Sequence, residues 1–484
     1  MEEKFIKIET DEAKFETSFY FETCTESSIK IDIKIGKLVK FWENLGFRKL
    51  KMPKGGYRFV KIRSSCIICD AYEEELTDAV KYKLLHQEKK ETVWEEFLSG
   101  NYVNKRSFQG LDSIQEVQLN ISTEQNAYFY FKNGALKVSA DTLELIPYEN
   151  YPGYILESQI IDFEIDISKR NYKDSDFNKF IKNVTANDKN RYAQLISSIG
   201  YIIHGYKSPT TTRALILVDE CLDFSGEANG GTGKSIIGKA ISKITSTLSK
   251  DGKTLHNKTN RFFYQDIDLS HRVLYLDDVN ADFNFEEFYS VVTGDMTVEE
   301  KYKASYKIPF NLSPKLMISS NYMVKGSGGN SDERRRIEIE IAPHYSAEFT
   351  PFDEFGKKLF DDWNCHEWNS FYHCLIFYCQ YFIKNGIVAY KPINLEENKL
   401  KMATDVSFVD FADMNIKFET GKKMITINKT TFYTAYKEKY PVESRNITNI
   451  LFKKWLDKWA KTRSLTCNHR KSDGGVFVDF MKTE

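Results

Sequence analysis

The sequence lacks an excess of charge of either sign. Its 484 residues include 68 Lys and Arg and 69 Asp and Glu, which gives a formal net charge of −1 at pH 7. A protein that binds polyanions over its whole surface would be strongly basic, so this class is excluded. Any surface that binds nucleic acid must therefore be local.

Long hydrophobic runs are also missing. Residues 1–16 are charged and contain no apolar core, so we expect no signal peptide. The most apolar stretch, Phe371–Ile383, is interrupted by His373 and Gln380. It is too short and too polar to cross a bilayer and instead predicts a buried helix. We therefore expect no membrane partner.

Cysteine is scarce and scattered. Eight cysteines without an expected secretion signal predict reduced thiols in a cytoplasm. The one Cys-x-x-Cys motif, Cys66 to Cys69, lies in a β-like run with no second pair of ligands nearby. We interpret it as a structural thiol pair and not as a zinc or redox site.

The chain does have enough residues for several cores. A length of 484 residues predicts three or four domains, and 41% hydrophobic with 14% aromatic residues can fill them. No internal repeat and no long low-complexity linker divides the chain.

The most informative motif is a predicted phosphate-binding loop. It consists of six consecutive residues, Gly230, Gly231, Thr232, Gly233, Lys234 and Ser235. Glycines let backbone N–H groups approach a triphosphate, the lysine reaches the β- and γ-phosphates, and the serine hydroxyl binds Mg²⁺. An apolar run over 214–218 predicts a buried strand before the loop. Apolar spacing over 236–248 predicts a helix after it, whose N-terminus would face the phosphates.

One residue departs from the strict phosphate-loop pattern. The pattern requires glycine at position 228, where this chain has Ala228, and Gly226 lies two residues too early. A flexible glycine-rich loop is the alternative interpretation. The acidic and amide residues that follow at suitable spacing favour the nucleotide site.

Two further predicted strands end in polar residues. The strand over 273–276 is followed by Asp277 and Asp278, and the strand over 315–320 by Asn321. Asp277 is predicted to hold Mg²⁺, and Asp278 to orient or deprotonate the attacking water. Asn321 could hydrogen-bond the γ-phosphate and that water. Taken alone, each of these polar ends could instead start a turn.

Lysines and tyrosines alternate between these two strands. In the run 297–307, a β-hairpin would place Lys301, Lys303 and Lys307 on one face. Lysines suit phosphate contacts and tyrosines suit base stacking, so we predict that this hairpin binds single-stranded DNA. An ordinary charged edge strand is the alternative.

Together these motifs resemble superfamily 3 helicases, the AAA+ ATPases of small DNA viruses, phages and mobile elements. The run 300–303 followed by 319–321 looks like the family's DNA-translocating hairpin and sensor. Arg335, which precedes an alternating strand over 337–341, occupies the position of the family's arginine finger, although a solvated charge cluster is the alternative. The phage and prophage primase-helicase branch, related to the poxvirus-type helicases, is the more similar one.

This resemblance implies an α/β fold built around an AAA+ P-loop ATPase core. Residues 1–115 would form a small α+β accessory domain. Residues 116–205 would form a β segment, including the run 128–136, and a helical collar for oligomerisation. The ATPase core with its helical lid would span 206–390, and a winged-helix DNA-binding domain would span 391–484.

The two ends of the chain carry weaker signals. Residues 421–484 contain 14 Lys and Arg against 6 Asp and Glu. They predict a helix over 430–440, a second helix capped by Ser444 and a basic hairpin tip over 469–475. A solvated basic face is the alternative to DNA binding. Near the N-terminus, Asp32 and His86 stand alone, so we expect no primase activity.

These features predict an ATP-driven, ring-forming DNA helicase that initiates or drives replication of a phage, plasmid or integrated mobile element. ATP and Mg²⁺ are the expected cofactors, and the bacterial host cytoplasm is the expected location. Expected partners are single-stranded and duplex DNA, further copies of the chain in a ring that we expect to be a hexamer, and a replicative polymerase or primase. The alternative is a nucleotide-switched DNA-binding initiator or loader without processive unwinding. A monomeric P-loop kinase would leave the lysine hairpin and Asn321 unexplained.

Overall fold

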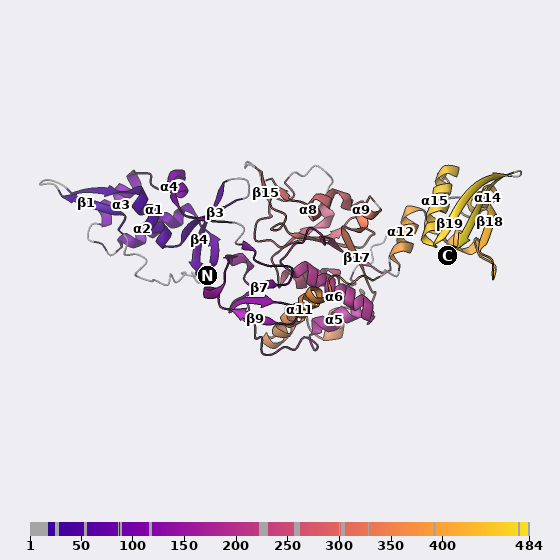
Figure 1. The fold of residues 1–484 in the computed structure, drawn as a ribbon, viewed down its shortest axis with the longest axis horizontal. Helices are drawn as coiled ribbons and strands as arrows, with labels where there is room; N and C mark the ends of the chain where they lie inside the picture. The colour runs from indigo at the N-terminus through magenta and orange to yellow at the C-terminus, as the bar shows by residue number, and fades with distance from the viewer. Residues whose placement is uncertain are drawn as a thin grey trace.

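The computed structural model describes residues 18–24, 29–52, 56–85, 87, 90–115, 119–221, 231–255, 262–299, 301, 305–327, 329–390, 394–472 and 475–482. An N-terminal, a central and a C-terminal unit follow one another along the long axis (Figure 1). The fold is mixed α/β and includes one all-parallel sheet, which lies in the central unit.

This parallel sheet has five strands in the order β12-β13-β16-β11-β17. They are β11 (Ala214–Asp219), β12 (Thr247–Asp251), β13 (Val273–Val279), β16 (Lys315–Ser320) and β17 (Arg336–Ile341). Side chains of β11 alternate between two buried clusters, with Leu215 and Leu217 in one and Ile216 and Val218 in the other. Both faces of the sheet are covered, which explains the continuous apolar runs that predicted its strands.

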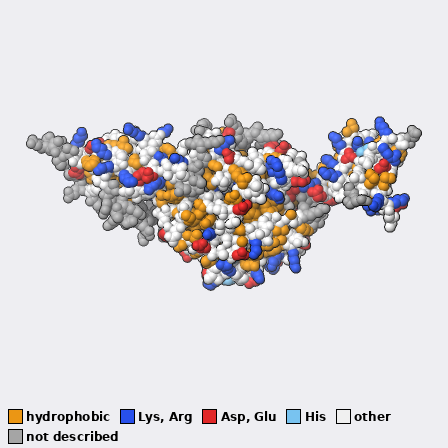
Figure 2. Space-filling view, viewed as in Figure 1, with side chains coloured by type: hydrophobic (Ala, Val, Ile, Leu, Met, Phe, Trp, Pro, Cys, Tyr) orange, Lys and Arg blue, Asp and Glu red, His pale blue; other side chains and the backbone are white. Residues whose placement is uncertain are grey.

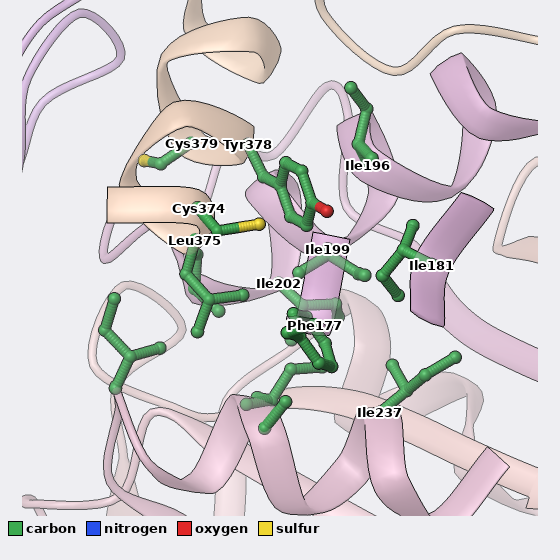
Figure 3. Packing of buried hydrophobic residues seen from close by; sticks show 14 of the residues in the cluster. Phe177, Ile181, Ile196, Ile199, Ile202, Ile237, Cys374, Leu375, Tyr378 and Cys379 are labelled. Carbon is green, nitrogen blue, oxygen red and sulfur yellow. The ribbon is translucent and has the colours of Figure 1, made fainter. Parts of the chain in front are cut away.

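Helices from distant parts of the chain share one of these clusters. They are α5 (Asp176–Val184), α6 (Lys189–Ile203), α7 (Lys234–Ser242) and α11 (Cys365–Asn385). Figure 3 shows Phe177, Ile199, Ile237 and Tyr378, one from each helix, in this cluster. Gly200 lets α6 and α11 approach closely, because a Cβ there would lie 2.1 Å from the carbonyl oxygen of Tyr378. The predicted buried helix over 371–383 is confirmed as part of α11.

The helix after the phosphate loop is shorter than its apolar spacing predicted. A helix over 236–248 was expected, but α7 ends at Ser242 and Leu248 belongs to β12. Ile244 is buried although it lies in the turn between them. Apolar residues of a turn can point into the core as those of a helix do, so the spacing overestimated the helix length.

The N-terminal unit is α+β, and its five-stranded sheet has the order β10-β5-β4-β3-β6. Its elements are β1 (Tyr20–Cys24), β2 (Ile29–Ile33), α1 (Ile35–Asn44), β3 (Phe47–Lys51), β4 (Tyr57–Ser64), β5 (Ile67–Asp70), α2 (Glu73–Leu84), α3 (Lys90–Ser99), α4 (Lys105–Gly110) and β6 (Ser113–Ile114). The edge strand β10 (Ile155–Leu156) pairs in parallel with β5. The sheet therefore crosses the boundary that we predicted between residues 115 and 116.

Residues 127–146 form an antiparallel meander of β7 (Ala127–Phe131), β8 (Gly134–Val138) and β9 (Leu143–Ile146). The run 128–136, which we expected within a β segment, is thus a hairpin that turns at Lys132 and Asn133. The remaining elements of the central unit are α8 (Tyr289–Thr293), β14 (Met296–Val298), β15 (Tyr306–Ile308), α9 (Asn330–Glu333) and α10 (Pro351–Phe355).

The C-terminal unit packs its own buried cluster. Its elements are α12 (Leu395–Ala403), α13 (Val406–Asn415), β18 (Met424–Asn428), α14 (Lys429–Lys439), α15 (Asn449–Thr462), β19 (Leu465–Ser472) and β20 (Gly475–Lys482), and the sheet order is β18-β20-β19. The second predicted helix begins later than expected, since Thr448 and not Ser444 caps α15. Ile447 and Phe452, on either side of that cap, share the buried cluster in the positions of a hydrophobic staple.

Candidate nucleotide-binding site

The residues predicted for the phosphates, the metal ion and the attacking water gather at the carboxyl edge of the parallel sheet. Strand β11 ends at Asp219, β13 ends with Asp277 and Asp278 close to its last residue, and Asn321 directly follows β16. The N-terminus of α7 begins at Lys234 in the same region. This edge is where open α/β sheets hold their ligands.

Glycine is required at two positions of the loop before α7. Gly231 and Gly233 have φ values of 99° and 106°, which favour glycine. A Cβ on Gly233 would also lie 2.6 Å from the ring of Phe180. Gly230 and Ala228 lie outside the described residues.

Lys234 is buried and ion-paired. Its Nζ lies 2.6 Å from Oδ1 of Asp219 and 3.2 Å from Oγ1 of Thr232. The Thr232 hydroxyl donates to the same Asp219 oxygen at 2.6 Å. Lys234 is 7% exposed and Asp219 is 3% exposed. Sequence reasoning missed Asp219, and the available signal was a carboxylate at the end of the strand before the loop.

Three hydroxyl groups surround Asp277. Tyr275 and Ser319 each donate to its Oδ1 at 2.6 Å, and Ser235 donates to it at 3.2 Å. Burial, followed by the nearby Asp277 carboxylate, raises the pKa of Tyr275 well above its usual value, so the phenol stays a hydrogen-bond donor. The Ser235 and Asp277 oxygens are hard ligands at a spacing that suits neighbouring positions around Mg²⁺. Tyr275 and Ser319 were not predicted.

Asp278 lies between an amide and a lysine. Asn321 Nδ2 donates to its Oδ1 at 2.9 Å, and Lys253 Nζ lies 2.5 Å from its Oδ2. Lys253 comes from a short 3₁₀ helix, η5 (Gly252–Thr254), and its pKa is raised by the hydrogen bond and charge of Asp278.

The backbone at Asp278 is unusual for a strand. Its φ is 56°, and the pairing of β13 with β16 shifts register between Leu276 and Val279. Such irregularities redirect a side chain at the end of a strand. They place the Asp278 carboxylate toward Asn321.

Arg335 lies away from these residues. It precedes β17, and the start of β17 pairs with the start of β11, so it occupies the amino edge of the sheet. Six residues of strand separate the two edges by about 20 Å. Its guanidinium contacts Ser331 and lies over the ring of Tyr289. Arg336 is paired with the buried Asp332, whereas Arg334 is exposed.

The lysine hairpin is shorter than predicted. Its paired residues are Met296–Val298 and Tyr306–Ile308, with Lys307 opposite Thr297. Lys301 lies in the connection, where its Nζ is 5.9 Å from the ring of Phe262. Lys303 lies outside the described residues. The expected single face carrying Lys301 and Lys307 is therefore not formed by the strands.

Basic side chains mark the C-terminal unit. Four lysines of α15 are exposed, namely Lys453, Lys454, Lys458 and Lys461. Figure 2 shows Lys and Arg side chains over this unit. The hairpin of β19 and β20 adds Arg470 and Lys471, which are also exposed.

The two cysteines of the Cys-x-x-Cys motif were predicted to be a structural thiol pair. Cys66 and Cys69 are both buried and free, and burial raises the pKa of the Cys66 thiol to about 11. This value disfavours the reactive thiolate.

Within the part of the chain that is described, none of the helices combines the length and apolar character needed to cross a bilayer.

Comparisons with known proteins give partial and weak matches. The family described as "Family of unknown function (DUF5906)" matches residues 226–336. No curated protein matches the sequence significantly. The apo structure of the NrS-1 C-terminal region is 12% identical and covers 92% of this chain and 99% of its own, with a TM-score of 0.43. A ligand-bound JCV helicase is also 12% identical, covers 35% of this chain and 45% of its own, and has a TM-score of 0.25. TM-scores below 0.5 are too low to establish a shared fold.

Proposed function

We propose that the protein is an ATP-driven DNA helicase that forms a ring and acts in the replication of a phage, plasmid or integrated element. One observation carries this proposal. The loop lysine Lys234, the Ser235–Asp277 pair and the Asp278–Asn321 pair come from the N-terminus of α7 and the ends of β13 and β16, and they meet at one edge of a parallel sheet. This combination supplies groups for the phosphates, the metal ion and the attacking water.

Each group of the proposed site has a distinct task. The N-terminus of α7 and Lys234 would bind the β- and γ-phosphates of ATP. Ser235 and Asp277 would hold Mg²⁺, which offsets phosphate charge when bound. Asp278 and Asn321 would orient the attacking water, with Asp278 accepting its proton.

The position of Arg335 supports a site shared between subunits. At the amino edge of its own sheet it is too distant to contact its own phosphate site, as described above. A neighbouring chain in a ring could receive it at the γ-phosphate, and we propose that Arg335 acts there. Arg334, which is exposed, is the adjacent alternative.

DNA contacts are proposed at two places. Lys301, Lys303 and Lys307 would bind single-stranded DNA in the ring channel. The order α13-β18-α14-α15-β19-β20 supports a winged helix in which α15 and its four lysines bind duplex DNA.

The separate core of the C-terminal unit favours one second function. A DNA-binding unit with its own buried cluster could serve a nucleotide-switched initiator or loader that does not unwind DNA. Strand-displacement assays with ATP separate these functions, because an initiator would bind DNA and hydrolyse ATP slowly without releasing a strand.

Replacement of Lys234 tests the nucleotide site itself. Lys234→Ala should abolish ATP hydrolysis and strand displacement in the full chain. Because Lys234 is buried beside Asp219, it should also lower the melting temperature, so folding must be followed by circular dichroism. Near-normal hydrolysis by folded Lys234→Ala would refute the site.

A further inference from the structure

Asp219 lies beside the phosphate loop, and its negative charge opposes a phosphate ligand. Its Oδ1 accepts hydrogen bonds from Lys234 and Thr232, both at 2.6 Å. The three side chains are at most 8% exposed. Lys234 thus already has an anionic partner in the place where it would bind a triphosphate.

Burial explains why such a partner is needed. An ammonium group removed from water without an anion is strongly disfavoured. When phosphate groups leave the loop, Lys234 would be left in this position unless another anion takes their place. Asp219 is the carboxylate that contacts it, since Asp277 and Asp278 are held by other donors.

We propose that Asp219 exchanges with the phosphate groups for Lys234, and so weakens nucleotide binding and speeds the release of ADP. The inference rests on the proposed nucleotide site. Lys234 has three N–H donors, of which the Asp219 and Thr232 contacts use two. An arriving phosphate competes for these donors and is also repelled by the Asp219 charge. Both effects are reversed when the product leaves, so Asp219 is a positioning residue that favours the empty site.

The test compares Asp219→Asn with Glu220→Gln in the full chain. Asparagine keeps the shape and one acceptor but removes the charge. Glu220 is the next residue, and its carboxylate pairs with Arg191 at 2.6 Å instead of the loop. Fluorescent ADP with Mg²⁺ is the probe, and its dissociation constant and dissociation rate are measured by titration and stopped flow.

Asp219→Asn should bind ADP about tenfold more tightly, mainly through slower dissociation, because a charge-assisted hydrogen bond no longer competes. The dissociation constant of Glu220→Gln for ADP should stay within about twofold of that of the natural chain, because the Glu220 carboxylate does not compete for Lys234. An unchanged dissociation rate in Asp219→Asn, or weaker binding, would overturn the exchange. If the natural chain itself does not bind ADP, or if Lys234→Ala binds it normally, the proposed nucleotide site fails instead.

A second variant covers the case in which Asp219→Asn does not fold. The double variant Asp219→Asn with Lys234→Met removes both charges of the buried pair. In that case the double variant should recover a cooperative thermal transition, because no unpaired ammonium remains. A double variant that stays unfolded would show that Asp219 does not act through Lys234, and would overturn the inference.

Discussion

At the scale of single residues, the acids of the candidate site are held in place by neighbouring donors. Asp277 accepts from Tyr275, Ser319 and Ser235, and Asp278 accepts from Asn321. Donors arranged before a ligand arrives need no reorganisation when it binds. The hydroxyl groups of Tyr275 and Ser319, which donate to the proposed metal ligand Asp277, should therefore affect the affinity for Mg²⁺.

Tyr275→Phe tests this supporting role. The change keeps the ring and removes the hydroxyl that orients Asp277. We expect the Mg²⁺ concentration for half-maximal ATP hydrolysis to rise by about tenfold, since removal of such an outer hydrogen bond typically costs 10- to 100-fold. Tyr192→Phe is the matched control, because the hydroxyl of this half-buried tyrosine donates to Asn178 in the helical region. Equal Mg²⁺ requirements in the two variants would contradict the role of Tyr275.

At the scale of elements, the hairpin of β14 and β15 differs from the predicted one, which had its three lysines on one face. Its paired strands cover three residues each, so that of its described lysines Lys307 lies in β15 and Lys301 lies in the connection. Their proposed contacts with DNA depend on the connection and not on one strand face. Removal of the charges should still matter, because lysines bind phosphates as point charges.

Lys301→Ala combined with Lys303→Ala should spare basal ATP hydrolysis and abolish its stimulation by DNA. The log–log salt dependence of single-strand binding should become shallower by roughly 0.7 for each phosphate that the variant no longer neutralises. Filter binding at several salt concentrations measures this slope. Lys132→Ala with Lys137→Ala, which removes two ion-paired lysines near β8, is the control. Identical slopes for the two pairs would argue against DNA contact by the hairpin.

At the scale of the whole molecule, the parallel sheet separates the proposed phosphate site from Arg335. Its carboxyl edge holds Asp277 and its amino edge holds Arg335. In the proposed ring, one chain would supply two halves of shared sites that face different neighbours. A mixture of two inactive variants, each with one intact half, would then restore activity.

A mixture of Arg335→Ala and Lys234→Ala should recover part of the ATP hydrolysis that each variant lacks, provided that subunits exchange. Arginine fingers contribute about 10³- to 10⁵-fold in rate, so the single loss should be large. Arg334→Ala tests the adjacent alternative finger and should retain ATP hydrolysis if Arg335 is the finger. Arg336→Ala is unsuitable, because it would leave the buried Asp332 unpaired. If exchange is demonstrated by fluorescence and activity stays absent, Arg335 does not complete the neighbouring site.

Deletion of residues 391–484 should weaken binding of duplex DNA more than ATP hydrolysis. The buried cluster of this unit includes Leu400 and Phe408, so a cut at residue 420 would leave part of its core exposed. A cut before α12 avoids this. Electrophoretic mobility shifts and ATPase rates measure both effects, and unchanged duplex binding would assign the unit to assembly.

The sequence by itself determined three strands of the parallel sheet and the order of the site motifs. Continuous apolar runs identify β11, β13 and β16 because both faces of a parallel sheet are buried, and polar residues at their ends follow directly. The glycines at 231 and 233 belong to a local sequence motif, and their positive φ values are a local requirement of the loop.

Only the tertiary structure decided which side chains meet. The pairs Asp219–Lys234 and Lys253–Asp278 join residues separated along the chain by a loop or a strand, and no periodicity encodes such contacts. The burial of Lys234, the early end of α7 and the place of Arg335 at the opposite edge likewise follow from sheet order and packing. Sheet order and packing depend on how segments far apart in the sequence bury one another, and a local sequence pattern carries no information about that.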